Sequence, residues 1–227
     1  MNHIRHPLKT LEVEGHQIEE AVRAIMHTIL FLRAKPKYTY KGPGSYSIGT
    51  VGYEDVDCDC IDLTYTRMPS RKLQDKVHAN ISKFCDAMRG RQEICNMGET
   101  VTGTITLQFY QRNKATWTLG DDTVPWEDWL VSVNLVTRNT ERGRQTMLER
   151  LSDDMREIIF TIIQITNNDD FYTPKDPKQE DMDSVFDTSF EEFQSYLFKM
   201  QASVNDVPLE ETGIVGATVR KISQALS

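Results

Sequence analysis

Two cysteines flanked by aspartates form the first cluster in the sequence that could bind a metal. Cys58 and Cys60 lie two residues apart within residues 57–60, whose sequence is Asp-Cys-Asp-Cys. On a β-strand such residues point to the same side, so the two thiols could share an ion. A structural metal site needs more ligands than these two, and Cys85 and Cys95 do not lie at ligand spacing. We therefore expect no metal, and reduced cysteines, since no export signal accompanies them.

A glycine-rich segment at residues 40–52 could contact phosphate groups. Phosphate-binding loops connect a strand to a helix N-terminus, and the common form ends in Gly-Lys-Ser or Gly-Lys-Thr. Neither that ending nor a predicted helix follows here. Turns between strands are the favoured interpretation, because Gly and Pro are typical turn residues.

The histidines are scattered along the chain, at His3, His6, His16, His27 and His78. No Gly-x-Ser-x-Gly or His-Glu-x-x-His motif accompanies them, so neither a nucleophilic nor a zinc hydrolase is indicated. His27 lies among apolar positions of a predicted helix, where a hydrogen-bonded structural histidine is expected rather than a catalytic base. The sequence offers no acid, base and nucleophile set, and we expect no catalytic residue, no cofactor and no enzyme.

Trp117 is an aromatic residue in an otherwise polar segment, residues 113–122. The other two tryptophans, Trp126 and Trp129, lie in a predicted strand and are expected in the core. A tryptophan on a loop is either packed beneath that loop or offered to a partner, where its large area makes it a frequent binding hot spot. Composition alone leaves these two interpretations open.

Around these residues, apolar side chains recur at helical spacing in three long segments. The pattern predicts helices over residues 16–33, 69–90 and 140–166. Alternating or β-branched segments predict strands at 11–13, 101–112, 126–138 and 193–204, with two or three more within 38–68. Residues 91–100 are expected to form a loop, and residues 218–226 a short helix or an edge strand. Because helices do not alternate with strands one for one, we predict an α+β fold, a mostly antiparallel sheet with three main helices packed on one face.

The sequence is expected to form a single domain, residues 1–227, with three polar segments. These are a polar leader at 1–10, a protruding loop at 113–124 and an acidic connector at 167–187. The connector is rich in aspartate and contains Pro174 and Pro177, a composition that cannot supply a core. A solvated, mobile connector is favoured over a partner-binding segment.

Composition excludes several classes of function. The chain carries 26 Lys and Arg against 34 Asp and Glu, a formal net charge of -8. General nucleic-acid binding needs a surplus of basic residues, and anionic membranes are disfavoured for the same reason. No apolar segment is long enough to span a membrane, and the first residues lack the apolar core of a signal peptide. We expect a cytoplasmic protein without nucleic-acid binding or direct membrane insertion.

Several segments together resemble one known family. Residues 46–52, Tyr-Ser-Ile-Gly-Thr-Val-Gly, are followed by Asp-Val-Asp-Cys-Asp at 55–59 and Ile-Asp at 61–62. Further matches are His-Thr-Ile-Leu at 27–30, Pro-Trp-Glu at 125–127, and Val-Phe-Asp-Thr at 185–188 leading to Tyr196, Leu197 and Lys199. In this order they cover nearly the whole chain, and the sequence resembles the autophagy-related protein 101 family.

The resemblance implies a HORMA domain that acts by binding. Members of this family pair with the HORMA domain of autophagy-related protein 13, stabilise it, and help assemble the autophagy-initiating kinase complex at the sites where autophagosomes form. The segment 193–227 corresponds to the part that rearranges around a peptide in spindle-checkpoint HORMA proteins, whereas this family resembles the open state. A peptide-capturing switch that works by strand addition, and a small enzyme without a recognisable motif, remain the alternatives.

The resemblance also implies a partner-binding loop, the WF finger, whose Trp-Pro-Phe motif recruits downstream autophagy factors. This sequence aligns Trp117 with the motif but has Thr118 and Leu119 in place of Pro and Phe. The loss of Pro removes a fixed φ, while Leu keeps an apolar contact of smaller area. We expect Trp117 to anchor a partner and Leu119 to support it.

Overall fold

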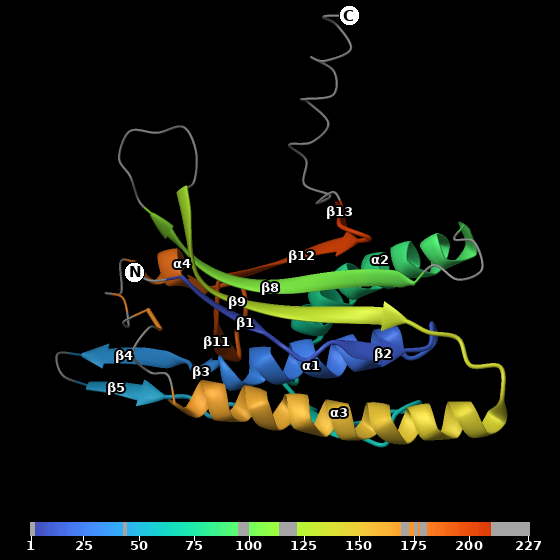
Figure 1. Cartoon of the computed structure of the whole chain (residues 1–227). Coiled ribbons are helices and arrows are strands. Elements are labelled where there is room, and N and C mark those ends of the chain that lie inside the picture. The colour runs from blue at the N-terminus through green and yellow to red at the C-terminus, as the bar shows by residue number, and fades with distance from the viewer. Residues whose placement is uncertain are drawn as a thin grey trace, which may run out of the picture.

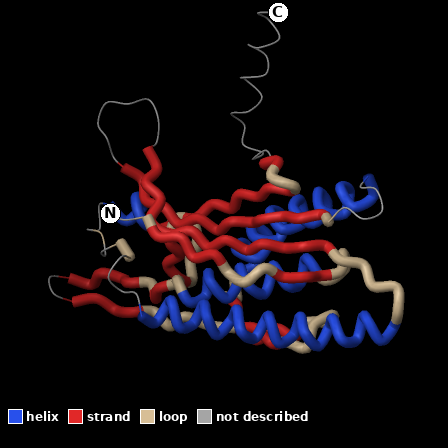
Figure 2. Tube along the Cα trace, viewed as in Figure 1, coloured by secondary structure: helices blue, strands red, loops and turns tan. Residues whose placement is uncertain are grey.

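The computed structural model describes residues 3–42, 45–94, 100–113, 122–168, 173–174, 177 and 181–209. A main sheet crosses the molecule, and three long helices accompany it (Figures 1 and 2). The helices are α1 (Ile18–Leu32), α2 (Arg71–Ile94) and α3 (Glu141–Asn168), and the short α4 (Met182–Val185) precedes the last strands. The predicted α+β class, with a mostly antiparallel sheet and three main helices, is confirmed, and the arrangement is consistent with a HORMA-like fold.

The main sheet is built around two long central strands. Its strands, in spatial order, are β1 (Ile4–Pro7), β9 (Asp122–Leu135), β8 (Val101–Asn113), β12 (Phe198–Val204) and β13 (Val207–Pro208), and β2 (Leu11–Val13) also pairs with β9. β1 and β2 run parallel to β9, whereas β8, β9, β12 and β13 pair antiparallel.

Smaller sheets surround the main one. β10 (Phe186–Asp187), β11 (Phe193–Tyr196) and β3 (Lys35–Pro36) form a short antiparallel sheet, and two hairpins join β4 (Tyr38–Gly42) to β5 (Ser45–Ile48) and β6 (Glu54–Asp57) to β7 (Thr64–Arg67). The region 38–68 therefore holds four strands, more than the two or three predicted.

The side chains of the main sheet alternate between a buried and an outer face. Along β8 the buried positions are Val101, Gly103, Ile105, Leu107 and Phe109, while the residues between them are exposed or half-buried. α2 contacts β8 and β12, α1 contacts both α2 and α3, and α3 contacts β2. α1 is the central core helix, as its apolar pattern predicts, since most of its residues are buried.

Several segments differ from their predicted form. Within the polar leader, residues 4–7 form β1, because backbone bonds to β9 and charged contacts fix a segment with few apolar residues. α2 continues four residues beyond Gly90, to Ile94, into the predicted loop 91–100. The acidic connector 167–187 contains the last residues of α3 and the whole of α4 and β10. Residues 218–226 lie outside the described part.

The predicted strand 193–204 is two strands, β11 and β12, which are separated by Leu197. The Leu197 amide donates to Val185 O, at 2.9 Å, and Leu197 O accepts from the Tyr110 amide, at 3.0 Å. The backbone therefore turns at Leu197 from the small sheet into the main sheet. Alternation alone does not reveal this break, since Leu197 and its neighbours are all buried.

Gly103 lets α2 approach the sheet closely. A Cβ at this position would lie 2.7 Å from Phe84 Cε2 and closer still to Met88 Sδ, and both of these α2 side chains are fully buried. We expect Gly103→Ala to lower the free energy of unfolding by about 1–3 kcal/mol through overpacking, as measured by chemical denaturation.

Gly90→Ala is the matched control, because an added Cβ there meets nothing within 4 Å and the position lies inside α2. It should raise stability by up to about 1 kcal/mol through helix propensity. If Gly103→Ala is as stable as the wild type, close packing at Gly103 does not limit the approach of helix to sheet.

Candidate partner-binding site

The predicted partner-binding residues Trp117, Thr118 and Leu119 lie outside the described residues. Their stem is described: β8 reaches Asn113 and β9 begins at Asp122, and these two residues face each other. β8 thus leads into the predicted loop 113–124, and β9 leads out of it. We call residues 110–113 and 122–125 the stem; Figure 1 shows β8 and β9 bending away from the other strands at this end.

A β-bulge marks the foot of the stem. Phe109 pairs with Glu127, but Tyr110 pairs with Pro125, so Trp126 is an extra residue in β9. The Tyr110 amide donates to Leu197 O rather than to β9. A bulge bends its strand and increases the local twist, which accounts for the changed direction of the two strands.

Aromatic rings pack beneath the bulge. Trp126 is fully buried, and its ring centroid lies 5.4 Å from that of Phe109 and 5.0 Å from that of Tyr196. Phe186 stacks on Tyr196 at 4.9 Å, and Phe198 meets Phe109 edge-on at 6.4 Å. Aromatic pairs at such distances contribute stability beyond their buried area. The predicted core positions of Trp126 and Trp129 are confirmed. Trp126 packs directly below the stem and supports it.

A buried ion pair lies beside this aromatic cluster. Glu127 is fully buried, and Arg33, at the end of α1, donates from Nε to Oε2 at 2.9 Å and from Nη2 to Oε1 at 2.5 Å. His6 Nε2 lies 3.3 Å from the same Oε1, and the His6 ring lies over Trp129 with centroids 4.4 Å apart. A two-point guanidinium–carboxylate pair fixes orientation as well as distance.

The next carboxylate, Asp128, points to the outer face of the sheet. It is also buried, and its oxygens meet His3 Nε2 at 2.9 Å, Arg5 Nε at 3.3 Å and Gln108 Nε2 at 2.8 Å. Arg5 lies in β1, His3 directly precedes β1, and Gln108 comes from β8. Both faces of β9 directly below the bulge are thus held by basic groups from the N-terminal segment or from α1.

The basic residues that contact Glu127 and Asp128 were not predicted from the sequence. Arg33 was assigned only to the end of a helix, and His3 and His6 to a polar leader. The available signal was the pair Glu127-Asp128, which lies in a predicted strand between two tryptophans, Trp126 and Trp129, that are expected in the core. Buried acidic residues need partners, but the sequence does not show which distant cations provide them.

The cysteines do not form a metal site in the part of the chain that the structure describes. Cys58 and Cys60 follow β6 in a bend, and among the described residues no group of three or more His, Cys, Asp or Glu could hold an ion. Burial and the Glu20 charge raise the pKa of the Cys58 thiol to about 12, and burial raises that of Cys85 to about 11. Such thiols stay protonated and unreactive near neutral pH. Cys95 lies outside the described residues.

Glu20 explains the form of the Asp57–Cys60 segment. Its buried carboxylate accepts from the Asp59 amide at 2.6 Å and from the Cys60 amide at 2.7 Å. Asp62 continues the attachment, because its amide donates to Ser152 and its carboxylate meets Arg156 on α3. The Asp57–Cys60 segment and Asp62 thus have a structural role, because their hydrogen bonds and ion pair attach this loop to α1 and α3.

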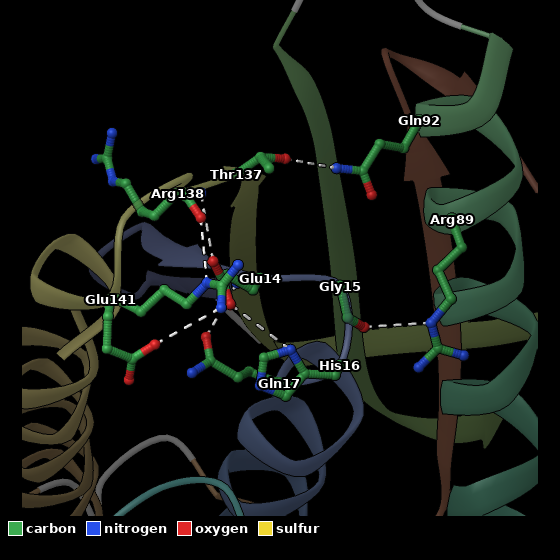
Figure 3. A network of polar contacts seen from close by, with 10 residues as sticks. Glu14, Gly15, His16, Gln17, Arg89, Gln92, Thr137, Arg138 and Glu141 are labelled. Carbon is green, nitrogen blue, oxygen red and sulfur yellow. Dashed lines mark hydrogen bonds and ion pairs between the residues drawn. The ribbon is translucent and has the colours of Figure 1, made fainter.

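A polar recess of about 560 Å³ lies at the other end of the sheet, beside the starts of α1 and α3 (Figure 3). Glu14 lines the recess and accepts from the Arg138 amide at 3.3 Å, while Gln17 Oε1 accepts from the Glu14 amide at 3.0 Å. Arg89 donates to Gly15 O, and Gln92 to Thr137 Oγ1. These bonds join loops and helix ends to one another, so the recess is explained as a structural junction.

The described part contains no helix that is long and apolar enough to cross a membrane.

His27 is buried, as predicted, but its environment differs from the expected one. Its Nδ1 has no hydrogen-bond partner among the described residues, and its ring stacks on Tyr65 with centroids 6.3 Å apart. Burial, and then the positive charges of Arg67 and Arg23, lower the pKa of His27 to about 4. The side chain is therefore neutral near pH 7 and packs as a ring.

This lowered pKa predicts a loss of stability in acid. Below the ordinary pKa of 6.5 the unfolded chain binds a proton at His27 that the folded chain does not bind, so stability falls as the pH drops from 6.5 towards 4. The contribution lost over this window is about 3 kcal/mol. In His27→Leu, denaturation series between pH 7 and pH 4 should show a smaller fall than in the wild type. His78→Gln, at an exposed position, is the control; equal falls in all three proteins would contradict the assignment to His27.

Comparisons with known proteins agree with one another on the family. A family profile described as Autophagy-related protein 101 matches residues 10–180. Proteins of that name from Xenopus tropicalis and Homo sapiens are 41% and 40% identical over 202 residues, which cover 89% of this chain and 89% of each relative. The Arabidopsis thaliana protein is 24% identical over 194 residues, with 74% of this chain and 78% of its own length covered. The chain therefore belongs to the autophagy-related protein 101 family.

Proposed function

We propose that this chain is a non-catalytic adaptor in autophagy initiation. It pairs with the HORMA domain of autophagy-related protein 13, stabilises that domain, and acts as a subunit of the autophagy-initiating kinase complex. Its loop with Trp117, Thr118 and Leu119 recruits downstream autophagy factors. The protein acts in the cytoplasm and is recruited to the sites of autophagosome formation.

The observation that carries this proposal is membership of the family at about 40% identity over 89% of the chain. Such similarity supports a role in autophagy. The α+β architecture, consistent with a HORMA-like fold, supports pairing with a second domain of that kind. The net charge of -8 supports a protein partner rather than nucleic acid.

The stem supports the role of the loop. A scaffold of packed rings and buried charges lies directly below the strands that carry residues 114–121. Binding residues are often found on loops that a rigid scaffold holds in place. Trp117 supplies a large aromatic surface at low entropic cost, as binding hot spots commonly do.

Pairing with autophagy-related protein 13 is tested first. The purified chain, mixed with the HORMA domain of autophagy-related protein 13 from the same organism, should elute as a one-to-one heterodimer in size-exclusion chromatography with light scattering. Two folded proteins that elute separately would contradict the pairing. A complex that forms only when a peptide is added would favour the peptide-capturing switch instead.

The loop is tested by Trp117→Ala/Leu119→Ala in cells that lack the native protein. The variant should still co-precipitate autophagy-related protein 13, but starvation should produce few autophagosomes, counted by electron microscopy. Loss of a tryptophan hot spot costs about 2 kcal/mol or more, a fall in affinity of about thirtyfold.

A surface control removes similar apolar area elsewhere. Ile48 and Tyr53 are 60% and 66% exposed, so Ile48→Ala/Tyr53→Ala should leave autophagosome numbers unchanged. Thr118→Pro/Leu119→Phe restores the family motif and should give at least wild-type numbers, because Pro limits the freedom of the unbound loop and Phe adds contact area. A fall in this variant would contradict the alignment of Trp117 with the motif.

A further inference from the structure

Glu127 occupies an unusual place for a charged side chain. It is fully buried, on the inner face of β9, and it immediately follows the bulged residue Trp126. Its partner Arg33 is also buried and lies 94 positions away in the sequence, at the C-terminal end of α1. The pair therefore joins the central helix to the strand at the point where the stem begins.

The bonds of this pair fix a direction. Two guanidinium nitrogens of Arg33 donate to the two oxygens of Glu127, at 2.9 and 2.5 Å. The Arg33 backbone is itself fixed, since its amide donates to Ile29 O at 3.0 Å as the last turn of α1 ends. A planar fork that meets a carboxylate at two points permits little rotation, unlike the single charge of a lysine.

Stability alone does not account for a buried ion pair. Removing two charges from water is costly, and replacement of such a pair by apolar residues is often neutral or stabilising. A buried pair can instead select one arrangement among several compact ones. Here the arrangement to be selected is local, because Phe109↔Glu127 is the last regular pair of β8 and β9 before the bulge.

We propose that the Arg33–Glu127 pair is a positioning element that holds the bulge in one register and so sets the direction of the stem. The proposal rests on the proposed function in one respect, that residues 114–121 bind a partner whose approach depends on this direction. Neither Arg33 nor Glu127 needs to touch that partner. The aromatic rings below the bulge fill space, and the ion pair supplies the orientation.

Hydrogen–deuterium exchange of the isolated chain tests the proposal without any partner. Arg33→Lys keeps the positive charge but loses the two-point contact of the guanidinium group with the carboxylate. The backbone amides of the stem, at 111–113 and 122–124, should therefore exchange about tenfold faster than in the wild type. The amides at 103–107, farther along β8, should exchange at the wild-type rate. Arg156→Gln, which breaks the exposed Arg156–Asp62 pair, is the control and should leave stem exchange unchanged.

A second variant separates orientation from stability. Arg33→Met/Glu127→Met removes both charges of the pair together, so that neither Arg33 nor Glu127 is left in the core without the other, and it should fold with a melting temperature near that of the wild type. His6 loses its contact with Glu127 Oε1 in this variant but keeps its packing on Trp129. The stem amides of this variant should nevertheless exchange about tenfold faster, since the directional bonds are gone.

The proposal is overturned if both folded variants show wild-type stem exchange. It is also overturned if exchange rises equally at 103–107 and in the stem, because that result describes general destabilisation. The recruitment test of Trp117 and Leu119 is independent of these rates. If the Arg33 variants show faster stem exchange but normal recruitment of autophagy factors, the positioning role stands and its link to binding is rejected. If only the Trp117 test fails, the binding function of the loop is rejected and the positioning role stands.

Discussion

The antiparallel pairing of β8 with β9 is the interaction on which the rest of the structure depends. It runs from Val101↔Leu135 to Asn113↔Asp122, and β1, β2 and β12 attach directly to one of these two strands. Because side chains alternate along a strand, a slip by one residue would turn the apolar face away from the helices. The register that buries the core therefore also decides where the loop at the far end begins.

The two ends of this pairing are built differently. At one end, polar side chains and backbone groups join the turns that lead into α1 and α3, around Glu14. At the other end, aromatic rings and buried charges support two strands that continue beyond the sheet. The first arrangement closes the fold, and the second supports the strands of the stem. If the chain acts as the proposed adaptor, a fixed direction of the stem matters more for its function than a pocket does.

Much of the fold follows from local pattern, and the parts that do not follow depend on distant partners. The three long helices were predicted because apolar residues such as Leu73, Val77 and Ile81 recur at helical spacing and pack on the sheet. β1 was not predicted, since this four-residue strand has no apolar alternation to mark it, with Arg5 and His6 at its centre, and its stability comes from β9. The break at Leu197 and the Arg33–Glu127 pair likewise depend on residues far away in the sequence, which periodicity cannot identify. Trp117 is singled out by the resemblance and by its polar surroundings in the sequence, whereas the packing beneath the stem is visible only in three dimensions.

The parallel direction of β1 has a practical consequence for work with this protein. Since Ile4 faces Glu127 and Pro7 faces Leu130, β1 runs away from the stem, and the amino end of β1 lies at the foot of the stem. An affinity tag or fluorescent protein placed directly before β1 would therefore be anchored beside the stem, the side from which partners are expected to approach. Such a fusion could shield that surface, or a small dye in its place could report on occupancy of the loop. The position before β1 is thus suited to a reporter group and is not a neutral point of attachment.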